Sequence, residues 1–170
     1  MNPLIDQFPT KVRIGNEILE VNSDFRNCLT IILAFEDEEL TIIDKYEIML
    51  ARLFGKTLDY FKDNLEEAIK QGVKFLDCNK TFEEVEKRVY SFKKDAEFIY
   101  SAINITHHID LNEIEYMHWW KFCIFFLDID SDCTMSNIIY FRQKKNEGKL
   151  NSEERKLYLK NYKTLSLEYD

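Results

Sequence analysis

The sequence predicts a mainly α fold: a single helical domain of about six to seven helices with an N-terminal two-stranded β-hairpin. Three observations lead to this prediction. The chain has 170 residues, of which 45% are hydrophobic, so it can bury a sizeable core. It has only four glycines and two prolines, too few for the many turns of an all-β sandwich. Apolar residues also recur at helical spacing through most of the chain after residue 22.

Residues 10–21, TKVRIGNEILEV, are predicted to form the hairpin. Gly15-Asn16 supplies a two-residue turn, in which glycine takes the positive φ that the first turn position of a type II′ turn requires. That register places Lys11 opposite Glu20 on the exposed face. Because two strands alone are only marginally stable, the hairpin is expected to lie against helices.

A helical core is expected over residues 24–128, with capping residues at the ends of its helices. The first helix is predicted from Asp24 to about Glu36, with Asn22-Ser23 as its cap. Thr41 followed by Asp44 caps the second, which Gly55 ends, and Asp63 with Glu66 opens the third, which Asn79 closes. A fourth helix is predicted over roughly residues 92–107. Asp110 with Glu113 resembles a capping box and predicts the start of a fifth.

The C-terminal helices are expected over residues 132–163, starting after Asp132 or Thr134 and again at Asn151-Ser152 with Glu154. Residues 142–170 hold eight basic and five acidic residues, a charge of +3, which leaves −11 for residues 1–141. We interpret this mildly basic segment as a solvated helix surface. The net charge of −8 disfavours a nucleic-acid partner, although DNA binding through residues 142–163 stays open as the minor alternative.

The segment 115–128, EYMHWWKFCIFFLD, gathers both tryptophans of the chain on the fifth predicted helix. Trp119 and Phe126 line one side of that helix, whereas Trp120 points about 100° away. Its polar stripe is too narrow for a surface helix, so we interpret it as the central core helix. The alternative is a partner-binding face formed by Trp119, Trp120, Tyr116 and Phe126.

The candidate metal motifs are incomplete. Glu115-x-x-His118 matches half of a di-iron carboxylate site, but no second Glu-x-x-His occurs, so His118 is interpreted as structural. The run DIDSD at 128–132 copies the first ligands of an EF-hand loop, yet Cys133 and Ile139 stand where glycine and glutamate are needed. We therefore expect neither a metal nor another cofactor.

The sequence also predicts no enzyme. Walker, G-x-G-x-x-G and G-x-S-x-G motifs are absent, and Cys123 lies in the most apolar segment, where burial would raise the pKa of a thiol. The four cysteines form no C-x-x-C pair, which favours reduced thiols in a cytoplasm. No secretory signal precedes the hairpin, and the apolar runs are too short to cross a membrane.

Four segments together resemble the bacteriophage gp-fifteen family of siphophages that infect Gram-positive hosts. They are NSDFRNCL (22–29), YSFKKDAEFIYSAI (90–103), IDLNEIEYMHWWKF (109–122) and IIYFR (138–142). The positions that carry the resemblance are Asp24, Phe25, Arg26, Asp95, Asp110, Leu111, His118, Trp119, Trp120, Lys121, Phe122 and Arg142. We interpret them as determinants of the fold, because the family pattern carries no catalytic or binding residues to transfer.

The resemblance implies a phage tail assembly protein. Members of the family look like chaperones that bind the tape-measure protein and help the tail tube to assemble, with the major tail protein as a further candidate partner and with self-association. Such a protein would act in the host cytoplasm and be absent from the mature virion. The alternatives are a structural component of the virion or tail and, less favoured, a phage regulatory protein.

Overall fold

The computed structural model describes residues 2–80 and 87–167, and these residues form two compact units. The first unit contains residues 2–80 and 115–124, and the second contains residues 87–114 and 125–167. Helices dominate both units and the only paired strands of the described residues form one hairpin, so the predicted mainly α fold is confirmed. The single domain stays a prediction.

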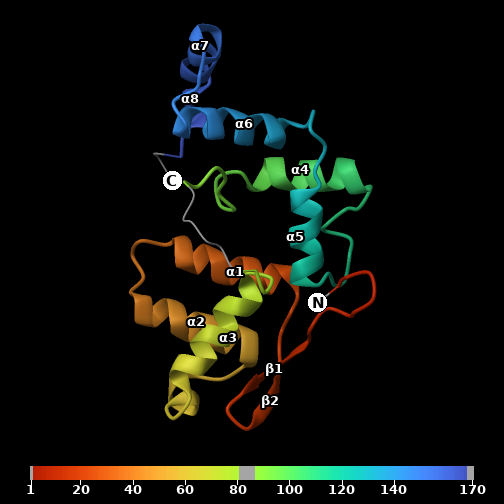
Figure 1. Cartoon of the computed structure of the whole chain (residues 1–170), viewed down its shortest axis with the longest axis vertical. Helices are drawn as coiled ribbons and strands as arrows, with labels where there is room; N and C mark the ends of the chain where they lie inside the picture. Colours follow the sequence, from red (N-terminus) through yellow and green to blue (C-terminus); the bar gives the residue numbers. More distant parts are fainter. Residues whose placement is uncertain (1, 81–86, 168–170) are drawn as a thin grey trace. The chain divides into compact units, whose positions relative to one another are not determined.

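The first unit consists of a β-hairpin and a group of helices (Figure 1). Its elements are β1 (Lys11–Ile14), β2 (Glu17–Glu20), α1 (Phe25–Glu36), α2 (Ile42–Phe54), the 3-10 helix η1 (Leu58–Phe61) and α3 (Leu65–Leu76). Helix α5 (Trp119–Leu127) begins in this unit and ends in the other. The second unit holds α4 (Ala96–His107), α6 (Thr134–Asn146), α7 (Ser152–Lys160) and α8 (Tyr162–Leu165).

The hairpin has the predicted register. Lys11 pairs with Glu20 and forms an ion pair of 2.7 Å, and Gly15 takes a positive φ of 57°. The Gly15 N–H donates to the Glu67 carboxylate on α3 at 2.9 Å, and a Cβ at Gly15 would lie only 3.0 Å from the Asn64 amide. Glycine is therefore required here twice, for its φ and for its small size, and the turn is held against α3.

Helices α1 and α2 lie side by side and bury the core of the first unit (Figure 1). Cys28 and Ile31 of α1 and Met49 and Leu50 of α2 have no exposed surface. The predicted boundaries of α2 are confirmed, because Thr41 and Asp44 form a reciprocal capping box and Gly55 ends the helix at a φ of 65°.

Three helices start later than predicted. Helix α1 is capped by Asp24, whose carboxylate accepts the Arg26 N–H at 2.9 Å, and not by Asn22-Ser23. Helix α3 starts after Asn64 and not at Asp63. Helix α4 starts at Ala96 and not near residue 92, because Ser91 and Asp95 first hold a turn: the Asp95 carboxylate accepts the Ser91 N–H at 2.9 Å.

The predicted start of the fifth helix at Asp110 is wrong, and α5 begins at Trp119. The Asp110 carboxylate instead accepts the Tyr100 hydroxyl at 2.6 Å and the Asn112 N–H at 2.8 Å. Immediately before α5, the chain makes an antiparallel bridge between His118 and Asp24. This backbone pairing competes with helix formation until Trp119, so the helix is shorter than the apolar pattern predicted.

The second unit is built around α4 and α6, which pack against each other, with α8 against α6 (Figure 1). Ile138, Tyr158 and Leu165 form a buried cluster that joins α6 to the C-terminal helices. The predicted start of α7 is confirmed, because Asn151 and Glu154 form a second capping box. Of the two predicted starts of α6, the one at Thr134 is observed, with Cys133 as its N-cap.

No helix among residues 2–80 and 87–167 is long and apolar enough to cross a membrane.

Candidate functional site

An aromatic stack lies where the start of α1 meets the start of α5. Phe25 stacks on Phe122 with ring centroids 4.9 Å apart, and Phe122 stacks on Trp119 at 5.6 Å. The Arg26 guanidinium lies 4.5 Å from the centroid of the Phe25 ring. All four residues are positions that carry the family resemblance, and here they hold two segments together that are nearly a hundred residues apart in sequence.

The two tryptophans are anchored by their indole N–H groups to the end of α3. Trp119 donates to the Leu76 carbonyl and Trp120 to the Phe75 carbonyl, each at 2.8 Å. Carbonyls in the last turn of a helix lack the partner that a following turn would supply. The Trp119 indole satisfies the Leu76 carbonyl, and the Trp120 indole adds a second donor to the Phe75 carbonyl, which also accepts the Cys78 N–H at 3.1 Å. Both tryptophans are less than 10% exposed, which fits the interpretation of this part of α5 as core.

His118 uses both ring nitrogens within the fold. Its Nε2 donates to the Pro9 carbonyl at 3.1 Å, and its Nδ1 accepts the Trp120 N–H at 3.0 Å. This arrangement requires the neutral Nε2–H tautomer. Burial lowers the pKa of His118, and the hydrogen bond to Pro9 offsets part of that effect. Both nitrogens are engaged within the fold, which supports the interpretation of His118 as a structural residue.

The residues predicted to bind a partner differ widely in exposure. Trp119, Trp120 and Phe126 are buried, and Phe126 packs edge-on against Tyr90 in the second unit. Tyr116 is 55% exposed, although its hydroxyl forms a 2.7 Å hydrogen bond with Ser23. Their role in partner binding stays a prediction.

A mostly apolar cavity of about 330 Å³ opens beside Trp120. We call it the Trp120 pocket, and its lining residues are Pro3, Phe8, Cys78, Asn79, Lys80, Trp120, Cys123 and Ile124. Ile124 is 43% exposed, and the neighbours of Pro3 along the chain, Leu4 and Ile5, are more than 80% exposed. Apolar surface is therefore available at the rim of this pocket, although the tryptophans themselves are covered.

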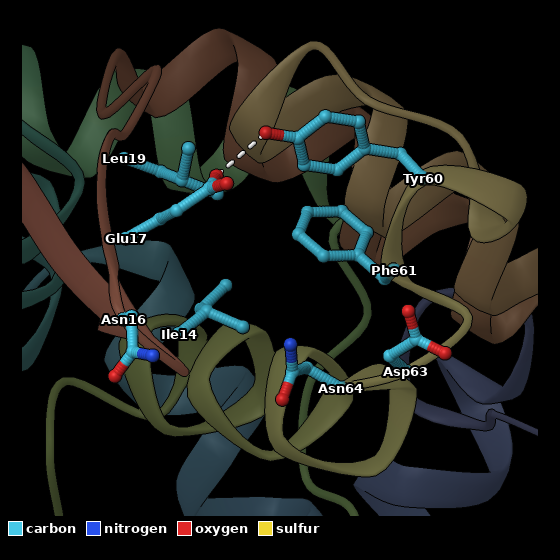
Figure 2. A pocket seen from close by; sticks show the side chains of 8 residues that line it. All are labelled: Ile14, Asn16, Glu17, Leu19, Tyr60, Phe61, Asp63 and Asn64. Carbon is cyan, nitrogen blue, oxygen red and sulfur yellow. Dashed lines mark hydrogen bonds between the residues drawn. The ribbon is translucent and has the colours of Figure 1, made fainter.

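A second cavity of similar volume lies between the hairpin and the η1–α3 connection (Figure 2). Its lining residues are Ile14, Asn16, Glu17, Leu19, Tyr60, Phe61, Asp63 and Asn64. The Tyr60 hydroxyl donates to Glu17 across the opening at 2.6 Å, and this hydrogen bond raises the pKa of Tyr60 (Figure 2). The cavity is more polar than the Trp120 pocket, and its lining holds neither a nucleophile paired with a base nor a set of metal ligands.

In the second unit, Asp95 and Arg142 form a buried ion pair, with side chains 1% and 3% exposed. The two groups make a two-pronged contact, and Arg142 also donates to the carbonyls of Leu165, Thr164 and Val89 at 2.9 to 3.2 Å. Every donor direction of the guanidinium plane is thus used to hold the C-terminal helices. Both residues are among the positions that carry the family resemblance, but their pairing was not predicted, because they are 47 positions apart.

Part of the positive charge in the C-terminal segment is neutralised locally. Lys144 forms an ion pair with Glu154 at 2.6 Å, and these contacts lower the pKa of Glu154 to about 2. Lys149 pairs with Glu147 at 2.7 Å. Together with the burial of Arg142, these contacts leave less free positive charge for a phosphate backbone than the count of basic residues indicated.

In the acidic loop before α6, Asp130 forms hydrogen bonds within the fold. The Asp130 carboxylate accepts the Asp132 N–H at 2.7 Å, and the Asp130 N–H donates to the Thr106 hydroxyl at 2.9 Å. Among the described residues, no group of three or more histidine, cysteine or acidic side chains is arranged to hold a metal ion.

Comparison with known proteins yields one match. Residues 4–167 match the family model described as "Bacteriophage Gp15 protein". No curated protein and no solved structure matches the chain. The matched range includes all the positions that carry the resemblance seen in the sequence, from Asp24 to Arg142.

Proposed function

Because the chain belongs to the bacteriophage Gp15 family, we propose that it is a phage tail assembly chaperone that binds the tape-measure protein. The observation that carries this proposal is the family match over residues 4–167, to which the sequence resemblance adds the tail-assembly role. In this role the protein catalyses no reaction. It acts in the host cytoplasm during assembly and leaves before the virion is complete.

The physical need for such a protein is clear. A tape-measure protein is expected to be a long helical chain with exposed apolar seams, which aggregates unless it is covered before the tail tube encloses it. A small acidic helical protein that covers those seams in many copies keeps the complex soluble. Self-association of the chain and contact with the major tail protein would bring those copies to the growing tube.

We expect the client to dock at the Trp120 pocket. The exposed side chain of Ile124 lines an apolar cavity, which suits an apolar side chain of an amphipathic helix. Residues 2–80 and 115–124 hold sixteen acidic and eleven basic residues, a charge of −5. The client helix is therefore expected to carry basic residues beside its apolar stripe.

Co-expression tests the proposal. The tape-measure protein of the same genome is expressed alone and together with this chain, and the soluble fraction and the co-purified complex are measured. We expect co-expression to raise the soluble yield of the tape-measure protein and to give a stable complex. Failure of both would contradict the proposed function.

Two variants locate the docking surface. Ile124→Asp places a charge at the rim of the Trp120 pocket and is expected to weaken the complex. Leu159→Asp alters a more exposed apolar residue in the second unit, 64% against 43% for Ile124, and is expected to leave the complex unchanged. The opposite order would move the docking surface away from the Trp120 pocket.

A further inference from the structure

Cys78 lies at a sharp turn at the end of α3. Cys78 and Asn79 both adopt left-handed backbone conformations, with φ of 55° and 59°. The Asn79 N–H donates back to the Lys74 carbonyl at 2.8 Å, which closes the helix end. This turn directs the chain away from α3 immediately after the two carbonyls that receive the indoles.

Cys123 follows the tryptophans on α5 by one helical turn. Since Trp119 and Trp120 are fixed to the carbonyls of Leu76 and Phe75, the next turn of α5 is brought toward the turn at Cys78, just beyond the end of α3. Both side chains line the Trp120 pocket, and the two thiols lie near enough for each to shift the pKa of the other.

The two thiols have different acidities. The hydrogen bond from Cys123 lowers the pKa of Cys78, and the nearby charge of Lys80 lowers it further, against the opposing effects of burial and Asp77. The same hydrogen bond and burial raise the pKa of Cys123. Cys78 is therefore the thiol that ionises first, with Cys123 as the donor that stabilises its thiolate.

We propose that Cys78 and Cys123 form a redox-sensitive dithiol, which a hydroperoxide converts into an intramolecular disulfide at the wall of the Trp120 pocket. The inference rests on the place of both cysteines in the wall of one pocket, beside the indole anchors that hold α5 to the end of α3, and on the access that the pocket gives to them. It is independent of the proposed chaperone function.

The reaction proceeds in two balanced steps. The Cys78 thiolate attacks one oxygen of hydrogen peroxide, the O–O bond breaks, and Cys78 sulfenic acid and hydroxide form. The Cys123 sulfur then attacks the sulfenic sulfur, and the sulfenic hydroxyl leaves with the Cys123 proton as water. The peroxide is reduced by two electrons, and the two thiols are oxidised to one disulfide.

The disulfide would link the end of α3 covalently to α5. It would fix the turn at Cys78 and replace two thiols of the pocket wall by one bridge, so the shape of the Trp120 pocket depends on the redox state. A thiol reductant would restore the open dithiol.

The test is a thiol count and a peptide map of the full chain after treatment with hydrogen peroxide. Of the four cysteines, two are expected to be lost, and non-reducing digestion is expected to give one linked pair of peptides that contain Cys78 and Cys123. Cys133→Ser serves as the matched control, because Cys133 is half-buried in the second unit. It should leave the linked pair unchanged.

Two further measurements separate the roles of the sulfurs. In Cys123→Ser, Cys78 is expected to accumulate as a sulfenic acid that dimedone labels, because the second thiol is gone. On the unaltered chain, phenylarsine oxide is expected to bind one equivalent by bridging both sulfurs, with loss of water. A peptide map with Cys78 and Cys123 free after peroxide, or linked only between chains, would overturn the proposal.

Discussion

The two units use different side chains to satisfy backbone carbonyls near the end of a helix. In the first unit, neutral indole N–H groups of Trp119 and Trp120 satisfy the last carbonyls of α3. In the second unit, the charged guanidinium of Arg142 satisfies the carbonyls near α8 while it is paired with Asp95. In both units, a side chain from one segment donates to backbone carbonyls of a segment that is distant in sequence. The hydrogen bonds hold the two segments together.

This difference determines how much stability each unit loses when its donor side chain is removed. Losing a neutral donor leaves one carbonyl without its partner, which costs the desolvation of that group. Losing one member of a buried ion pair leaves an uncompensated charge, which costs considerably more. The second unit should therefore be the more sensitive to a single substitution, and the first should tolerate the removal of one indole N–H.

The largest effect is expected for Arg142→Ala. It removes the partner of buried Asp95 and three carbonyl contacts, so we expect the free energy of unfolding to fall by about 3–5 kcal/mol. Urea denaturation followed by far-UV circular dichroism measures it. Lys149→Ala, which breaks an exposed ion pair, is the control and should change nothing measurable. A loss as small as that of the control would mean that Arg142 is not buried as described.

The next effect distinguishes the two tryptophans. Trp119→Phe keeps the aromatic ring but leaves the Leu76 carbonyl with only the distant Cys78 thiol at 3.9 Å, so we expect a loss of roughly 1–3 kcal/mol. Trp120→Phe should cost less, because the Phe75 carbonyl still accepts the Cys78 N–H at 3.1 Å. The same denaturation experiment compares them, and the reverse order would contradict the assigned hydrogen bonds.

Acidification is expected to weaken the first unit through His118. Burial lowers the pKa of folded His118, so the unfolded chain binds a proton at a higher pH than the folded chain does. Stability from this residue is complete above the ordinary value of 6.5 and is lost as the pH falls through 6.5 toward the folded pKa. His118→Gln should flatten the dependence of the unfolding free energy between about pH 7.5 and pH 5.5. An unchanged slope would show that His118 is already protonated in the fold.

The smallest expected effect is a difference between the alkylation rates of two cysteines. Because its pKa is lowered by Cys123, Cys78 is expected to react with iodoacetamide at pH 7 faster than Cys133. Cys123→Ser removes the thiol donor and should reduce that advantage. Mass spectrometry of timed digests gives the two rates within one sample. Equal rates in the unaltered chain would contradict the lowered pKa of Cys78.

The local parts of the fold were predictable. The Gly15-Asn16 turn, the capping box of Thr41 with Asp44 and the helix end at Gly55 depend on residues a few positions apart, and the structure has all three. Such signals act before tertiary contacts form, so one stretch of sequence is enough to predict them.

The remainder depends on contacts between distant segments. Asp110 looked like a helix cap, but Tyr100 and Asn112 engage its carboxylate, and pairing with residues 23–25 delays α5. The Asp95–Arg142 pair and the Cys78–Cys123 pair are likewise invisible along the chain. The helical period placed Trp119 and Trp120 on different sides of α5, but it gave no sign that both would anchor to α3.

The central claim is that this protein assists tail assembly and then departs. The most direct measurement is quantitative mass spectrometry of purified virions and of tail assembly intermediates from infected cells. The account predicts that peptides of this chain accompany the tape-measure protein in the intermediates and are missing from virions. Peptides present in virions at a fixed ratio to the tail proteins would contradict it and identify a structural component instead.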